Sequence, residues 1–240
     1  MKLERHPNAK AVAVRGADLV SELVAAKPEA VLLLPAGETP VPLYAELARR
    51  AREGLLDLSR AELFQLDELV GVAPDDERSF HHFFLQHLAQ PMGVRERLHL
   101  LDGTARDPGR EIERHARALA GLGGADLVLL GLGRNGHVAF NEPGSELQDR
   151  ARLVELCPTT VKALSAQFTN GRVPARGITL GLAEIAAARA IALFVTGSSK
   201  AEILTKLVSE QPTQACPATL LADHGKFLVL ADAAACRLLA

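Results

Sequence analysis

Short apolar runs alternate along the chain with longer segments whose apolar residues recur every three or four positions. Runs of this length are typical of strands that are buried on both faces of a sheet, and the longer period is typical of amphipathic helices. Strands are expected at 30–34, 63–66, 98–101, 127–130, 151–156, 176–182, 190–195, 217–221 and 227–230. Helices are expected at 18–26, with Asp18 as a possible cap, and at 41–52, 78–84, 108–120, 182–188 and 200–208.

The alternation of strands and helices predicts an α/β protein with a doubly wound, mostly parallel sheet and helices on both faces, a Rossmann-like arrangement. The sequence contains no internal repeat, low-complexity tract or linker. We therefore expect residues 1–240 to form a single domain.

Composition narrows the possible partners. Hydrophobic residues make up 48% of the chain and the net charge is −2, so we expect a globular protein that binds no nucleic acid. No apolar run is long enough to span a membrane, and the start of the chain lacks the apolar core of a signal peptide. The three cysteines, Cys157, Cys216 and Cys236, have no metal-like spacing, and their odd number suits a reducing compartment. A cytoplasmic location is the natural expectation.

Residues 127–145 carry the densest candidate chemistry. The apolar run ends in three glycines within six residues, and polar groups follow at once: Asn135, His137, Asn141 and Glu142. Glycines at a strand end allow a sharp turn and a close approach of the backbone to a ligand. The carboxyl ends of strands are also where open α/β sheets bind their ligands. The simpler alternative is a glycine turn with a solvated histidine.

The same glycines match G-x-G-x-x-G, and Glu155 follows Gly136 at nineteen residues, near the position of a ribose-binding acid. A dinucleotide site requires a long helix directly after the glycines. Pro143 and Gly144 mark a turn instead, and the motif lies in the middle of the chain. The dinucleotide alternative is therefore weak.

Two further strand ends suit an anion. Gly37 and Thr39 precede the helix expected at 41–52, and Lys200 closes a Gly-Ser-Ser-Lys turn at the start of another helix. Thr39 as a simple cap and Lys200 as a solvated lysine are the alternatives. His81, His82 and His87 have no carboxylate at ligand spacing, so we expect no metal site there.

The run from Gly131 to Pro143, Gly-Leu-Gly-Arg-Asn-Gly-His-Val-Ala-Phe-Asn-Glu-Pro, resembles the signature of the glucosamine-6-phosphate deaminase family, which includes galactosamine-6-phosphate isomerases. Supporting segments extend from about residue 32 to residue 232. The resemblance implies an enzyme of amino-sugar metabolism, classed among hydrolases and isomerases, that needs no metal or organic cofactor. It implies Asp67 as the base, His137 for ring opening and Glu142 as the acid that orients His137. Asn135 stands where many members have Asp.

The resemblance also implies phosphate binding by Gly37, Thr39 and Lys200. Glu38 replaces a frequent glycine, so we expect its carboxylate to point away or to pair with a cation. The phosphate-binding arginine of the family falls near residues 166–167, which are Ala and Gln, and the candidates to replace it are Arg172 and Arg176.

The expected substrate is a small amino-sugar 6-phosphate, glucosamine or galactosamine, which the sequence does not decide. The alternatives are a 6-phosphogluconolactonase, which shares the fold, and a sugar-phosphate-binding regulator without catalysis. The first favours a different glycine turn, and the second carries a DNA-binding segment that is not visible in the sequence. Residues 144–149 lack the basic, Ser-rich pattern of allosterically activated members, so we expect a monomer or small homo-oligomer.

Overall fold

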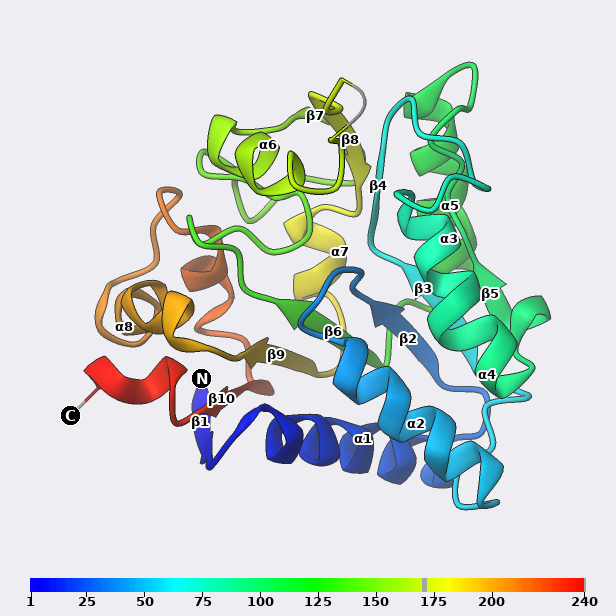
Figure 1. Ribbon diagram of the computed structural model, residues 1–240, viewed down its shortest axis with the longest axis horizontal. Coiled ribbons are helices and arrows are strands. Elements are labelled where there is room, and N and C mark those ends of the chain that lie inside the picture. Colours follow the sequence, from blue (N-terminus) through cyan, green and yellow to red (C-terminus); the bar gives the residue numbers. More distant parts are fainter. Residues whose placement is uncertain (170–171, 240) are drawn as a thin grey trace.

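The computed structural model describes residues 1–169 and 172–239. In this part of the chain, seven parallel strands form a central sheet in the order β1-β10-β9-β6-β2-β3-β5 (Figure 1). Their bounds are β1 Lys2–His6, β2 Val31–Leu34, β3 Glu62–Gln65, β5 Leu98–His99, β6 Leu127–Gly131, β9 Ile191–Val195 and β10 Phe227–Asp232. The expected doubly wound, mostly parallel sheet is confirmed.

The order of the strands reverses between β2 and β6. From β2 the chain adds β3 and β5 on one side, and it then returns to add β6, β9 and β10 on the other side. The loops that follow β2 and β6 therefore diverge at their carboxyl ends. Such a reversal opens a crevice outside the carboxyl ends of the strands, which is where doubly wound sheets bind ligands.

Helices cover both faces of the sheet. In β6, Leu127 and Leu129 pack in one apolar cluster, while Val128 and Leu130 pack in another. Helices α1 (Ala9–Ala26) and α2 (Val41–Arg52) supply the first cluster, and α5 (Pro108–Gly121), α7 (Leu182–Ala186) and α8 (Ala201–Ser209) supply the second. The alternation of strand side chains between faces produces this division.

A smaller antiparallel sheet lies beside the main one, with the order β4-β8-β7. It consists of β4 (Asp67–Leu69), β8 (Arg176–Thr179) and β7 (Arg152–Glu155), and helix α6 (Pro158–Leu164) lies next to it at the top of Figure 1. A third apolar cluster holds these elements together: Leu69, Val72, Phe140, Leu156, Leu164 and Phe168. This sheet was not expected from the sequence.

Several expected boundaries were wrong. Helix α1 begins at Ala9 rather than at Asp18, because the side chain of Asn8 accepts a hydrogen bond from the amide of Ala11 and caps it. Residues 217–221 form a 3₁₀-helix rather than a strand, since Pro217 begins it without an amide hydrogen to donate. Strand β1 and helix α6 were missed.

The remaining helices are short. They are α3 (Phe80–Phe84), a π-helix at Leu85–Ala89, α4 (Gln90–Met92) and 3₁₀-helices at Arg95–Arg97, Ser198–Lys200 and Ala235–Leu238. Within residues 1–169 and 172–239, none of the helices has the length and apolar character needed to cross a membrane.

Candidate active site

The segments that follow β3, β2, β6 and β9 meet at the carboxyl edge of the sheet, because these four strands are neighbours and run in parallel. These segments carry Asp67, at the start of β4, and Thr39, His137 and Lys200. Side chains that are more than 160 residues apart in the sequence therefore lie along one edge. We treat this edge as the candidate active site.

The glycine turn after β6 is shaped around His137. A Cβ atom on Gly133 would lie 2.4 Å from the imidazole ring of His137, and the amide of Gly133 donates a hydrogen bond of 2.9 Å to the carbonyl of His137. Gly136 adopts a positive φ of 87°, which closes the turn. The chain then forms an isolated bridge between Val138 and Asn141 rather than a helix. The dinucleotide alternative is therefore wrong, because the glycines open no helix for a pyrophosphate.

His137 and Glu142 form a close pair. Nδ1 of His137 lies 3.3 Å from Oε2 of Glu142, whose side chain is 8% exposed, compared with 23% for His137. Burial alone would raise the pKa of Glu142, but hydrogen bonding and the charge of His137, with help from Thr160 and Asn135, lower it to about 2. The carboxylate is therefore ionised near neutral pH. This is the arrangement in which an acid fixes the orientation of a proton-transferring histidine.

Asn135 lies between the two members of the pair. Its Nδ2 donates a hydrogen bond of 2.8 Å to Oε2 of Glu142, and its Oδ1 accepts one of 3.2 Å from the backbone amide of His137. The amide thus fixes the carboxylate and the loop, while the negative charge comes from Glu142. An aspartate at position 135 would have placed a second carboxylate against Glu142 at this distance.

Helix α6 supplies partners that the sequence did not reveal. Oγ1 of Thr160 lies 3.4 Å from Nδ1 of His137, and Oγ1 of Thr159 accepts a hydrogen bond of 3.1 Å from Nδ2 of Asn135. The only local signal was Pro158, which is typical of the first position of a helix. That signal predicts a helix start, but not its contact with the histidine.

Asp67 is the first residue of β4 and is 6% exposed. Burial, and then the negative charge of Glu68, raise the pKa of Asp67 above its usual range. Asp67 pairs with Thr179 of β8, and Oγ1 of Thr179 accepts a hydrogen bond of 3.3 Å from the amide of Phe140. Phe140 follows His137 by three residues. The small sheet thus connects Asp67 to the segment that carries His137.

The anion candidates lie on either side of the β6 loop. Gly37 has a φ of 100°, which turns the chain after β2 toward Thr39. Nζ of Lys200 donates a hydrogen bond of 2.6 Å to the carbonyl of Leu132, so the β9 loop is held against the β6 loop. Glu38 is exposed and lies close enough to raise the pKa of Lys200. The expectation that Glu38 points away or pairs with a cation agrees with this position.

The second cation of this region is Arg134, which the sequence analysis did not select. Burial, and then the charge of Arg134, lower the pKa of Lys200, so the two cations lie near each other. Arg176 begins β8 opposite Glu155, and both Arg172 and Arg176 are exposed. Arg134 could have been noticed because it stands inside the glycine motif, between Gly133 and Asn135.

Two of the three histidines that suggested a metal, His81 and His87, have other contacts. Nδ1 of His81 lies 2.9 Å from the carbonyl of Leu101, and the ring of His87 lies against the ring of Phe83 with the centroids 4.4 Å apart. The described residues hold no group of three or more His, Cys, Asp or Glu side chains that could bind a metal ion.

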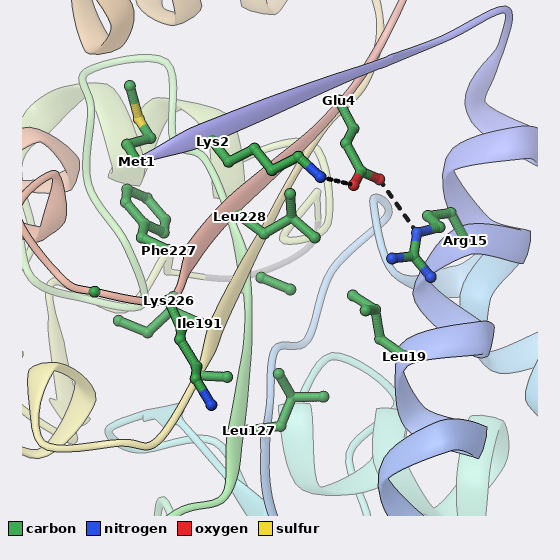
Figure 2. Close-up of a pocket in the computed structure, with 13 residues that line it drawn as sticks. Met1, Lys2, Glu4, Arg15, Leu19, Leu127, Ile191, Lys226, Phe227 and Leu228 are labelled. Carbon is green, nitrogen blue, oxygen red and sulfur yellow. Dashed lines mark hydrogen bonds and ion pairs between the residues drawn. The ribbon is translucent and has the colours of Figure 1, made fainter.

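Two surface cavities lie away from this edge. One, of about 420 Å³, lies at the amino ends of the strands and is lined by Leu127, Ile191 and Leu228, with Lys226 at its rim (Figure 2). Figure 2 also shows Glu4 paired with both Lys2 and Arg15 there. The other lies among the charged side chains of α5: Arg110, Glu113, Arg114 and Arg117.

A reversed strand order, a carboxylate–histidine pair and a buried second carboxylate at the same edge together describe a doubly wound α/β enzyme with a candidate acid–base site. The chain belongs to the family described as glucosamine-6-phosphate isomerases and 6-phosphogluconolactonases, whose model matches residues 4–229. The resemblance noted in the sequence is thereby confirmed.

Relatives within this family carry consistent names. The chain is 40% identical to glucosamine-6-phosphate deaminase 1 of Giardia intestinalis, over 88% of this chain and 81% of the relative. It is 36% identical to the glucosamine-6-phosphate deaminase of Bacillus velezensis, over 91% of both chains. A solved structure described as a monomeric glucosamine-6-phosphate deaminase superposes with a TM-score of 0.95 at 32% identity, over 99% of this chain and 100% of that one.

More distant neighbours share the fold alone. The 6-phosphogluconolactonase of Leishmania guyanensis superposes with a TM-score of 0.77 at 21% identity, over 100% of this chain and 98% of that one. The expectation of a hydrolase is corrected by the closer names, which are those of deaminases, and the class becomes isomerase and deaminase.

Proposed function

We propose that this protein converts an amino-sugar 6-phosphate, glucosamine 6-phosphate or galactosamine 6-phosphate, to the ketohexose 6-phosphate and ammonia. The observation that carries the proposal is the ionised Glu142, 3.3 Å from His137, on the same sheet edge as the buried carboxyl of Asp67. Family membership and deaminase relatives that are 32–41% identical support the same activity.

The first step is the anchoring and opening of the sugar. The Gly37 turn, the hydroxyl of Thr39 and the ammonium of Lys200 hold the phosphate, since backbone amides at a helix start and a lysine both favour an anion. His137 then moves the proton of the ring oxygen so that the pyranose opens. Glu142 keeps the imidazole in the orientation that this transfer needs and stabilises its charged form.

Isomerisation follows at C2. Asp67, as the carboxylate, takes the acidic proton from C2 and returns it to C1. This leaves an imine at C2, and a water molecule hydrolyses the imine to the ketone and releases ammonia. A base works best when its pKa lies near the working pH. The raised pKa of Asp67, caused by burial first, makes it a stronger base than an exposed aspartate.

The proposal includes a small-molecule partner, no nucleic acid or membrane partner, no cofactor, and a monomer or small homo-oligomer in the cytoplasm. The likeness to a structure described as monomeric supports the small assembly. Three free cysteines, at 157, 216 and 236, support a reducing compartment. We assign Arg134, together with Lys200, to phosphate binding, in preference to Arg172 and Arg176.

Ammonia release tests the proposal directly. The purified protein is incubated with each amino-sugar 6-phosphate, and both ammonia and ketohexose 6-phosphate are measured, with 6-phosphogluconolactone as the competing substrate. We expect equal amounts of the two products from at least one amino sugar. Lactone hydrolysis without ammonia release would replace the proposal with a lactonase. Binding of sugar phosphates without turnover would replace it with a regulator.

A further inference from the structure

Glu68 is a fully buried carboxylate that the reaction above does not use. It is 0% exposed and follows Asp67 directly. Its Oε1 accepts hydrogen bonds from the amides of Leu69, at 2.8 Å, and Phe80, at 3.0 Å. Its Oε2 accepts one of 2.6 Å from the amide of His81 and one of 3.0 Å from a buried glutamine, Gln65. Four donors thus fix one carboxylate between β3, β4 and the start of α3.

The surroundings leave this carboxylate no freedom. A Cβ atom on Gly103 would lie 3.3 Å from Cγ of Glu68 and 2.3 Å from the carbonyl oxygen of Leu69, so the loop after β5 packs directly on it. The carbonyl of Gly103 accepts a hydrogen bond of 2.7 Å from the amide of Gly71, just after β4. Oε1 of Gln65 in turn accepts a hydrogen bond of 3.0 Å from the amide of Leu101.

Capping of α3 explains only part of the position of Glu68. The local cap is Ser79, whose Oγ accepts a hydrogen bond of 2.9 Å from the amide of His82, and Glu68 takes the amides of Phe80 and His81, which Ser79 does not bind. A buried carboxylate is costly even when it is hydrogen-bonded, and a neutral side chain would cost less to bury. The location beside Asp67 is what distinguishes this residue.

We propose that Glu68 is the positioning residue for Asp67: it locks β4 to the start of α3 and holds a second carboxylate beside the base. Neighbouring side chains of a strand point to opposite faces, so Glu68 can hold α3 while Asp67 faces the substrate side. The inference rests on the proposed function, in which Asp67 is the base at C2. The charge of Glu68 contributes, after burial, to the raised pKa of Asp67.

Other titratable groups pack around this pair. His81 comes from α3, and its ring is paired with the carbonyl of Leu101. His115 of α5 contacts the carbonyl of Gln65, and burial lowers its pKa to about 4. Tyr44 of α2 has a raised pKa because of burial and then of Asp67. His115 and Tyr44 are therefore neutral near pH 7. Burial also raises the pKa of Glu68, to about 7, although hydrogen bonds from the amides of Leu69, Phe80 and His81 lower it. The charge of Glu68 therefore acts on Asp67 in the pH range in which Glu68 is ionised.

The test compares Glu68→Gln, Glu68→Asp and Glu62→Gln. Glu68→Gln removes the negative charge. Both carboxylate oxygens of Glu68 accept hydrogen bonds from N–H groups, so the NH₂ group of the glutamine would face N–H donors in either orientation of its amide. Glu68→Asp keeps the charge but is too short to reach both α3 amides. Glu62 is the matched control, because it is a half-buried β3 glutamate that bonds Arg97 and His99 instead. The readouts are kcat, KM, the pH profile of kcat/KM and hydrogen exchange at residues 80 and 81.

For Glu68→Gln we expect kcat to fall about tenfold or more with KM within about twofold, since the effect acts through the base. Loss of the neighbouring charge should move the acid limb of kcat/KM to lower pH by about half a unit or more. Exchange at residues 80 and 81 should accelerate. Glu68→Asp should also show faster hydrogen exchange at residues 80 and 81, but the acid limb of its kcat/KM profile should stay at the wild-type pH. Glu62→Gln should resemble the wild type in all readouts.

An acid limb that Glu68→Gln leaves in place would overturn the proposal, as would exchange at residues 80 and 81 that matches the wild type in both Glu68 variants. If Glu68→Gln does not fold, the test rests on Glu68→Asp. Hydrogen exchange at residues 80 and 81 that matches the wild type in Glu68→Asp would overturn the proposal that Glu68 holds β4 to α3. A wild-type protein that releases no ammonia would refute the proposed function, and the exchange experiment would still test the contact with α3 separately.

Discussion

Oε2 of Glu142 lies 3.3 Å from Nδ1 of His137, and the two residues are joined by a turn that contains a left-handed residue, Ala139, with a φ of 49°. A non-glycine residue in this conformation is strained, and such strain persists where the surrounding structure fixes it. The turn therefore presents the imidazole to the crevice while its acid partner stays buried behind it.

The Glu142→Gln variant should be less stable than the wild type by about 1–3 kcal/mol near pH 7. The folded pKa of Glu142 is about 2, below the usual value of 4.5 for an unperturbed glutamate, so its stabilising contribution is complete above pH 4.5. That contribution is lost as the pH falls toward 2, and the difference between variant and wild type should shrink over this range. Urea unfolding at pH 6 and pH 3 measures it. A difference that is equal at both pH values would mean that the ionised carboxylate is not the stabilising group.

Asp67→Asn should abolish turnover while substrate binding stays nearly intact, because an amide cannot accept the C2 proton. Loss of a general base costs about a hundredfold or more in kcat. The matched control is Asp57→Asn, the same change at an exposed aspartate in the loop before β3. Incorporation of solvent deuterium at C1 of the product gives the measurement. Deuterium entry at the wild-type rate in Asp67→Asn would assign the proton transfer to another group.

Lys200→Ala should raise KM for the phosphorylated sugar more than it lowers kcat, because the ammonium binds the phosphate equally in the ground and transition states. One charge-assisted contact is worth roughly 1.5–3 kcal/mol, which is about tenfold or more in KM. Lys226→Ala is the control, since this exposed lysine lies at the opposite edge of the sheet, by the cavity of Figure 2. An unchanged KM in Lys200→Ala would direct attention to Arg134 as the main phosphate ligand.

We expect no activation by N-acetylglucosamine 6-phosphate and hyperbolic kinetics. The loop after the Asn-Glu-Pro motif is closed by acids: Oδ2 of Asp149 accepts a hydrogen bond of 2.9 Å from the amide of Glu146 and lies 3.1 Å from Arg152. Carboxylates at this place repel an effector phosphate. Initial rates with and without the acetylated sugar phosphate measure the effect. A sigmoidal curve that becomes hyperbolic on its addition would show that an allosteric site exists.

The sequence predicted the parts of the fold that depend on local periodicity. Helix α2 runs from Val41 to Arg52 as expected. The apolar runs at 30–34, 63–66, 98–101, 127–130, 190–195 and 227–230 became strands of the parallel sheet. Some failures had local causes, such as the Asn8 cap of α1, and others came from long-range pairing. Asp67 was expected simply to follow a strand, but it begins β4 because it pairs with Thr179, more than one hundred residues later. No local pattern encodes that contact.

The sequence also predicted only part of the candidate site, for the same reason. His137 and Glu142 could be selected because they are five residues apart in a single motif, and the structure brings them together. Thr160 could not be selected from the sequence, because its hydroxyl lies near the imidazole of His137 only when α6 packs against the β6 loop. The roles of these residues, like the single-domain organisation of residues 1–240, stay predictions that the experiments above address.

The contact between Gly133 and His137 also limits how this protein can evolve. Every other amino acid carries a Cβ atom, and at this position that atom would lie 2.4 Å from the imidazole. Any substitution at position 133 therefore displaces the imidazole ring of His137. In a selection for growth on amino sugars, glycine should be retained at position 133 while neighbouring surface positions vary. A descendant with another activity would have to acquire its new side chains at other positions of the loop.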